Sequence, residues 1–110
     1  MPSERAARLA ENESLFRVAN ERMSNWEERQ RLDAREVYFC ECSHAECREK
    51  IELSKADYER VRSDSALFFV APGHEILDLE TVEADHGDWR VVRKNPEVRE
   101  IVEAADPRRG

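Results

Sequence analysis

The chain has 110 residues, of which 40% are hydrophobic and 39% charged, and its formal net charge of −7 gives a pI near 5.0. This length predicts a single domain with a modest apolar core. The acidic balance argues against general nucleic-acid binding, which depends on Lys and Arg side chains that neutralise phosphates. No apolar stretch approaches the roughly 20 residues that a membrane-spanning helix needs.

Residues 3 to about 31 are predicted to form one long helix, because Ala, Glu, Arg and Leu are frequent in this segment and it contains neither Pro nor Gly. Leu9, Phe16 and Met23 recur at seven-residue intervals and define an apolar stripe along this helix. The other members of the predicted stripe are Asn12, Leu15, Val18, Ala19 and Trp26. Such a helix buries one face, either against its own domain or in a seam with a second copy or a protein partner.

The remainder of the chain predicts short strands at residues 36–40, 50–53, 67–70, 79–84 and 89–93, the last two joined by a hairpin at 85–88. Ser54 is the expected N-cap of a short helix over residues 55–63, with Tyr58 and Val61 facing inward. Pro72-Gly73 predicts a tight turn, and Pro96 begins a C-terminal helix over residues 96–105. These elements predict one α+β domain: an N-terminal helix (1–32) packed on a small antiparallel sheet within residues 36–94, followed by the C-terminal helix.

Three cysteines occur within eight positions, as Cys40, Cys42 and Cys47, and the chain has no other cysteine. Such a dense group of thiols in a small chain is typical of a metal site, most often for zinc. The alternative is that the three are reduced cysteines without a ligand, which behave as small apolar side chains. We favour the metal site, with Cys40 and Cys42 turned toward one point by a bend in the chain and Cys47 returned to that point by the intervening loop.

A fourth ligand must then come from elsewhere, because zinc prefers four tetrahedral ligands. We predict His74, because it follows the Pro72-Gly73 corner at the end of a buried strand. His44 lies inside the loop between Cys42 and Cys47, where reaching the same ion is cramped, and His86 lies at a hairpin tip. Both remain alternatives, as does a water molecule or a carboxylate.

A closed Cys3His site predicts a structural role for the zinc ion, since it leaves no open position for a substrate. Glu75 beside His74 suggests a hydrolase with a zinc-bound water as a weaker alternative. A zinc-thiolate redox switch is the other alternative, because zinc-bound thiolates can be oxidised and release the metal.

Two further features have ordinary explanations. Trp26 and Trp89 are expected to anchor the core or an interface. Six acids surround the predicted hairpin and form what we expect to be a solvated acidic face, with docking to a basic partner as the alternative. They are Glu75, Asp78, Glu80, Glu83, Asp85 and Asp88.

Four segments (residues 12–22, 39–42, 58–62 and 70–75) resemble those of a family of short uncharacterised actinobacterial proteins. The Cys40-Glu41-Cys42 segment and the Pro72-Gly73-His74-Glu75 segment are its most specific parts, and the resemblance extends over residues 6–94. It implies that the three cysteines and His74 belong together, and that the protein is bacterial and cytoplasmic. It implies no activity.

A cytoplasmic location is also expected from the beginning of the chain, which lacks the apolar segment of an export signal because charged residues interrupt it. Thiols stay reduced in that compartment, so the odd number of cysteines fits metal binding better than disulfides. The sequence therefore predicts a non-enzymatic, zinc-stabilised interaction or regulatory module. Its partner is expected to be another protein, or a second copy bound through the N-terminal helix.

Overall fold

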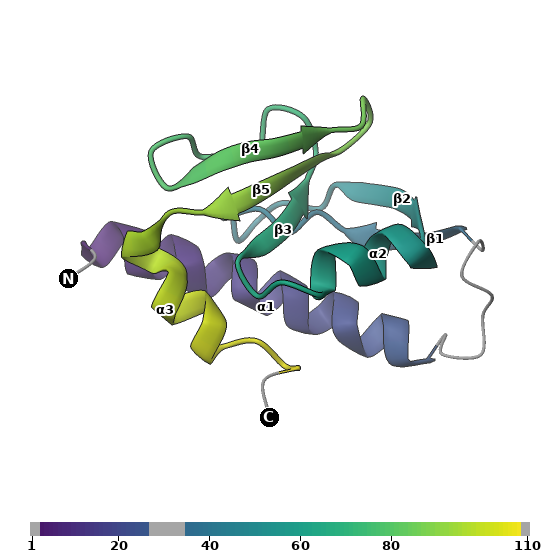
Figure 1. The fold of residues 1–110 in the computed structure, drawn as a ribbon, viewed down its shortest axis with the longest axis horizontal. Helices are drawn as coiled ribbons and strands as arrows, with labels where there is room; N and C mark the ends of the chain where they lie inside the picture. Colours follow the sequence, from purple (N-terminus) through teal and green to yellow (C-terminus); the bar gives the residue numbers. More distant parts are fainter. Residues whose placement is uncertain (1–2, 27–34, 109–110) are drawn as a thin grey trace.

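The computed structural model describes residues 3–26 and 35–108 of the chain. Helix α1 (Glu4–Trp26) is followed by strands β1 (Arg35–Phe39) and β2 (Lys50–Ser54) and by helix α2 (Lys55–Arg62). Strands β3 (Leu67–Val70), β4 (Glu80–Asp85) and β5 (Arg90–Lys94) come next, and helix α3 (Pro96–Ala104) ends the order (Figure 1). The predicted extension of the first helix to residue 31 or 32 lies outside the described residues, as do the side chains of Met23 and Trp26.

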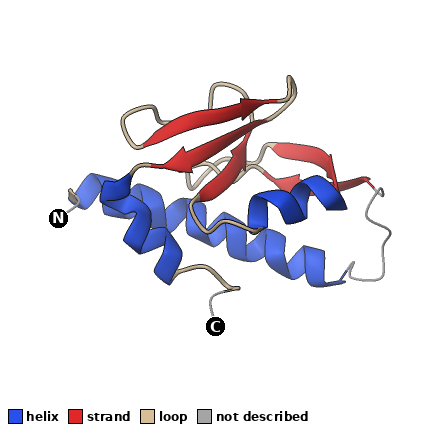
Figure 2. Ribbon diagram, in the orientation of Figure 1, coloured by secondary structure: helices blue, strands red, loops and turns tan. Residues whose placement is uncertain are grey.

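The α+β class is confirmed, but the strands divide into two antiparallel sheets where the sequence predicted one. Strand β1 pairs with β2, and the other sheet has the order β3-β5-β4. The helices gather on one side of the strands in Figure 2. The sheets are separate because the chain bends away from β1 after Phe39, and a single backbone bond from Glu41 N to Phe69 O (2.9 Å) joins this bend to β3.

Local signals in the sequence place the shorter elements correctly. Ser54 caps α2 by accepting a hydrogen bond from the backbone amide of Asp57 (3.1 Å), and Pro96 begins α3. Tyr58 and Val61 point into the core, and so does Trp89, as predicted. Tyr58 stacks on Tyr38 with ring centroids 4.4 Å apart, which connects α2 to β1.

The buried face of α1 is not the apolar stripe that the sequence suggested. Leu15 of that stripe is 69% exposed, and its described neighbours in the stripe are only half-buried. The buried side chains lie on the opposite face at helical spacing, namely Ala6, Ala10, Glu13, Ser14, Arg17, Asn20 and Glu21. The prediction is wrong because apolar residues do not mark the buried face of this helix. The helix packs through polar side chains, whose partners come from distant segments.

Arg17 shows how a charged residue is accommodated in this interface. Its guanidinium donates to the backbone carbonyls of Ser65 (2.7 Å) and Val102, and it lies 4.4 Å from the centre of the Phe68 ring. The three contacts hold α1 against α3 and β3 together. The hydrogen bonds from its two terminal nitrogens and the cation–π contact offset part of the cost of removing the charge from water, whereas Arg17 Nε has no hydrogen-bond partner in the described part of the chain.

Lys94, at the end of β5, lies fully buried between the carboxylates of Glu13 and Glu80. Two acids share one cation there, and burial raises the pKa of Glu13 to about 8, with the nearby Glu80 adding to the rise and Lys94 opposing it. At neutral pH Glu13 therefore keeps its proton, which reduces the negative charge around the buried ammonium.

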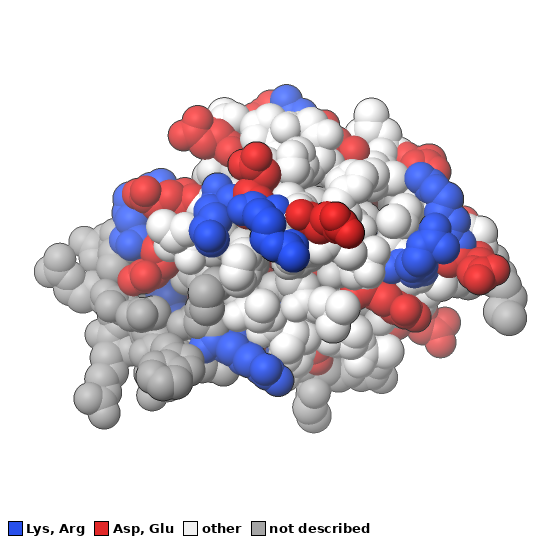
Figure 3. All heavy atoms as spheres, turned by 180° about the vertical axis from the view of Figure 1, so that it is seen from behind, with Lys and Arg blue, Asp and Glu red and all other residues white. Residues whose placement is uncertain are grey.

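The predicted acidic face is wrong for Glu80, which is 2% exposed, and most of the remaining acids are paired with arginines. Arg90 contacts Glu75 and Asp85, and Arg93 contacts Glu83. Positive and negative side chains adjoin one another in the same way over the face seen in Figure 3. The region around the β4–β5 hairpin is therefore largely neutralised by cations of the same sheet.

The substitution Glu13→Gln tests whether Glu13 is protonated in the native state. A carboxyl group whose pKa is 4.5 in the unfolded chain and about 8 in the native state releases its proton on unfolding between these values. Wild-type stability should therefore fall, relative to Glu13→Gln, as pH rises from 5 to 8, by at most about 1.4 kcal/mol per pH unit. Urea unfolding across this range measures the difference. Glu11→Gln, an exposed acid on the same helix, should follow the wild type, and parallel pH profiles for Glu13→Gln and wild type would contradict the assignment.

Candidate metal centre

The loop between β1 and β2 carries the three cysteines, and its geometry follows from the alternation of side chains in Cys40-Glu41-Cys42. Side chains two positions apart in an extended chain point the same way, so the two thiols face one side and Glu41 faces the other. Cys40 and Cys42 are buried, and Cys47 is half-buried. A turn closed by the bond from Cys47 N to His44 O (2.9 Å) returns the chain to the first two thiols.

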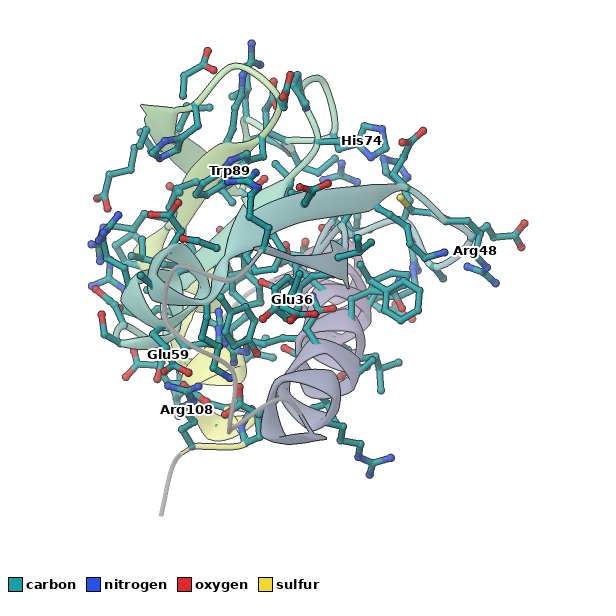
Figure 4. The ribbon with its side chains drawn as sticks, turned by 90° about the vertical axis from the view of Figure 1, so that its right-hand side faces the viewer. Glu36, Arg48, Glu59, His74, Trp89 and Arg108 are labelled. Carbon is teal, nitrogen blue, oxygen red and sulfur yellow. The ribbon has the colours of Figure 1, made fainter. Side chains whose placement is uncertain are left out.

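His74 reaches the same point from the end of β3. The chain turns after Val70, and the bond from His74 N to Ala71 O (3.0 Å) closes the predicted tight turn. Gly73 has φ of +88°, a conformation that a residue with a Cβ atom rarely adopts, which explains the glycine there. In Figure 4 a sulfur atom lies between the labelled His74 and Arg48 on the cysteine loop.

The structure brings all four predicted ligands together. The sulfurs of Cys40, Cys42 and Cys47 and a ring nitrogen of His74 lie within 4.8 Å of one another, a geometry that can hold a metal ion. His74 Nδ1 lies 3.6 Å from the Cys40 sulfur and 3.6 Å from the Cys47 sulfur. The alternative histidines do not belong to this group: His44 is exposed, and His86 stacks on Trp89 with ring centroids 4.0 Å apart.

Each sulfur also accepts a hydrogen bond from a backbone amide. The donors are Ala71 for Cys40, His44 for Cys42 and Glu49 for Cys47. Amide donors stabilise the thiolate form, which is the form that binds a metal. Sequence reasoning missed these donors because backbone amides leave no mark in a side-chain pattern.

The pKa values of the thiols reflect their mutual contact. The hydrogen bond from Cys40, with a smaller contribution from the His44 amide, outweighs the effect of burial and lowers the pKa of Cys42 to about 4. The same thiol–thiol bond and burial raise the pKa of Cys40, and burial raises the pKa of Cys47. Close packing of the three thiols therefore favours the ionisation of one thiol and opposes the ionisation of the next. A bound cation would stabilise all three thiolates.

Glu41 supports the bend from the side opposite to the thiols. Its carboxylate is fully buried, where it accepts from Asn20 Nδ2 (2.9 Å) and lies 3.6 Å from the Arg62 guanidinium. Burial raises the pKa of Glu41, and the Arg62 charge and the Asn20 hydrogen bond counteract that rise. Asn20 also accepts from Phe39 N (2.7 Å) and donates to Phe39 O (2.8 Å). Its side-chain amide thus makes the pair of hydrogen bonds that a residue of a neighbouring strand would make with Phe39.

Comparison of the chain with protein-family models, with curated proteins and with solved structures gives no match. The resemblance noted from the sequence therefore stays a prediction. None of the helices that the structure describes is long and apolar enough to cross a membrane.

Cys42→Ala removes a ligand from the centre of the group and should abolish stoichiometric metal binding. Losing a structural metal from a domain of this size costs several kcal/mol, so we expect the midpoint of thermal unfolding to fall by roughly 10 °C or more. Differential scanning calorimetry together with elemental analysis measures both effects.

The matched control is His44→Ala, which alters the same loop but no ligand. It should keep the metal and unfold within about 2 °C of the wild type, since exposed positions contribute little. A Cys42→Ala variant as stable as the wild type would show that the cluster has no structural role.

Proposed function

We propose that the chain is a non-enzymatic domain stabilised by one zinc ion and that it acts by binding another protein. The distances within the ligand group carry the zinc assignment. Bonds of about 2.3 Å to sulfur and about 2.0–2.1 Å to nitrogen, at tetrahedral angles, separate sulfur from nitrogen by about 3.6 Å. Both distances from His74 Nδ1, to Cys40 and to Cys47, are 3.6 Å.

The chemistry of the donors supports the same ion. Thiolates with an imidazole in a tetrahedral arrangement are typical of zinc, whereas calcium and magnesium require oxygen ligands. The ligands come from two segments more than 25 residues apart, so that binding an ion joins the β1–β2 loop to the end of β3. Metal binding of this kind contributes directly to folding.

A structural role for the ion is favoured over hydrolysis. Four protein ligands complete the coordination of zinc and leave no position for an activated water. Glu75, the residue suggested as a general base, has other partners: one carboxylate oxygen accepts from Gly73 N (3.0 Å) and the other from Arg90 Nη1 (2.8 Å). Glu75 is therefore engaged in structural contacts, which favours a domain that acts by binding over a hydrolase.

Elemental analysis of protein purified without added metal tests the assignment, with one zinc per chain as the expected result. Replacement by Co²⁺ should give the visible absorption of a tetrahedral ion together with thiolate charge-transfer bands. His74→Ala should weaken zinc binding and change the cobalt spectrum, whereas His86→Ala should do neither. A protein without bound metal that also fails to take up Co²⁺ would overturn the proposal.

A zinc-thiolate redox switch is a second candidate, favoured by the partial exposure of Cys47 beside two buried thiolates. Peroxide would oxidise the Cys47 thiolate by two electrons to a sulfenic acid, releasing hydroxide. Attack by a neighbouring thiolate would then form a disulfide, expel a second hydroxide and remove two ligands from the ion.

Hydrogen peroxide at a few-fold molar excess separates the two candidates. A structural site should keep both its zinc and its three thiols under these conditions. A switch should release the ion as two thiols are lost, and added thiol reductant should restore both. Zinc release is followed with a chromogenic chelator, and thiols are counted in denaturant.

A further inference from the structure

The solvent-facing side of α1 forms one wall of an apolar groove of about 340 Å³. Leu15, near the centre of this face, is 69% exposed. The lining residues are Asn12, Leu15, Phe16 and Ala19 of α1, Phe39 at the end of β1, and Ala45 and Arg48 of the cysteine loop. The volume is at the low end of known ligand pockets, so the groove has room for a few apolar side chains.

The charges next to this groove differ from those elsewhere on the surface. Eight basic residues are exposed in the described part of the chain, and four of them pair with a carboxylate: Arg5, Arg35, Arg60 and Arg108. The other four have no ion-pair partner among the described residues; they are Arg8, Arg22, Arg48 and Lys50.

Two of these cations lie at the groove, and the other two share a helix face with Leu15. Arg8 and Arg22 stand seven residues before and after Leu15, which is close to two turns and places them on the same helix face. Arg48 lines the groove, and the Lys50 ammonium lies 5.6 Å from the centre of the Phe39 ring. Arg48 is the one charged residue among the described residues that line the groove. The exposed acids of the same segments do not line it, although Glu11 stands about one turn before Leu15 on α1; they are Glu4, Glu11, Glu46 and Glu49.

We propose that this groove binds an acidic segment of a partner protein, which inserts apolar side chains beside Leu15 and Phe39 and places carboxylates against Arg48 and Lys50. An apolar centre with a charged rim is the usual anatomy of a protein interface. Unpaired cations on a chain of net charge −7 favour an acidic partner and speed its approach. This inference rests on the proposed function and identifies the chemistry of the partner.

The metal centre and the groove share one loop. Ala45 lies between Cys42 and Cys47, and Arg48 follows Cys47 and donates from Nη1 to the Cys47 carbonyl (2.9 Å). Metal binding therefore fixes the wall that carries Ala45 and Arg48, and removal of the ion should weaken the binding of an acidic segment.

A displayed library of random 16-residue peptides, selected against the zinc-loaded full chain, tests the proposal. Enriched peptides should combine Asp or Glu with Leu, Phe or Trp. The affinity of the most enriched peptide is then measured by fluorescence anisotropy. Leu15→Lys should weaken it by at least about tenfold, as should the double variant Arg48→Glu/Lys50→Glu, because the first removes the apolar contact and the second reverses the charge.

Two controls repeat each kind of substitution at one exposed position away from the groove. Leu77→Lys replaces another leucine that is 69% exposed, and Arg60→Glu reverses a cation that is paired with Asp57. Both should bind the peptide within about twofold of the wild type. Zinc content and melting temperature are recorded for every variant, so that failure of the metal site is distinguished from failure of the groove.

Several outcomes would overturn the proposal. These are a selection without enrichment, enrichment of basic peptides, or binding that Leu15→Lys leaves unchanged. Sedimentation equilibrium supplies a further test: a dimer that Leu15→Lys dissociates would show that a second copy occupies the groove.

Discussion

The contact between the β1–β2 loop and the corner after β3 is the interaction on which the rest of the structure depends. Among the described residues, backbone pairing between these two segments is limited to the bond from Glu41 to Phe69, and side chains supply the other contacts between the sheets. Phe69 N donates to the Glu41 carboxylate, and the Phe69 ring packs edge-on against Tyr38. Three sulfurs and one ring nitrogen converge there, supported by backbone amides. A metal ion bound at this point would join the two segments where a continuous sheet would supply hydrogen bonds, which suits a chain with a small core.

The second organising feature is the polar face of α1. Arg17, Asn20 and Glu13 each contact a different part of the chain: the carbonyls near α3, the end of β1 and the buried ammonium of Lys94. Buried polar groups of this kind specify one arrangement because each unsatisfied member is costly. Asn20 connects the two features, since it pairs with Phe39 and with Glu41 next to the metal ligands.

Sequence reasoning predicted the features that have local signals. Three such features are present: the cap at Ser54, the Pro72-Gly73 turn and the N-terminal position of Pro96 in α3. Caps and turns depend on residues that are neighbours in the sequence, so the sequence alone predicts them. The four converging ligands were also predicted, since thiols and an imidazole beside a turn have few alternative uses. The zinc ion and the function stay predictions.

The orientation of α1 and the division of the sheet could not be predicted in the same way. Which face of the helix is buried depends on partners such as Lys94 and the Val102 carbonyl, which are far away in sequence. Apolar periodicity selected the face around Leu15 and Phe16, which the structure leaves next to solvent. The break between sheets depends on the bend at Cys40 and Cys42, and a pattern of alternating residues does not reveal where two strands fail to meet.

The alternation at Cys40-Glu41-Cys42 has a consequence for how the chain can vary in length. Side chains in an extended segment exchange faces whenever a residue is inserted or deleted. One added residue here would turn a carboxylate toward the sulfur cluster and a thiol toward Asn20 and Arg62, disrupting both sides at once. The stretch from Ser43 to Glu46, which forms a loop and supplies no ligand, is free of this constraint. A length change between the first and second cysteines should therefore disrupt both faces of the chain, whereas one between the second and third would alter only the turn that closes on His44.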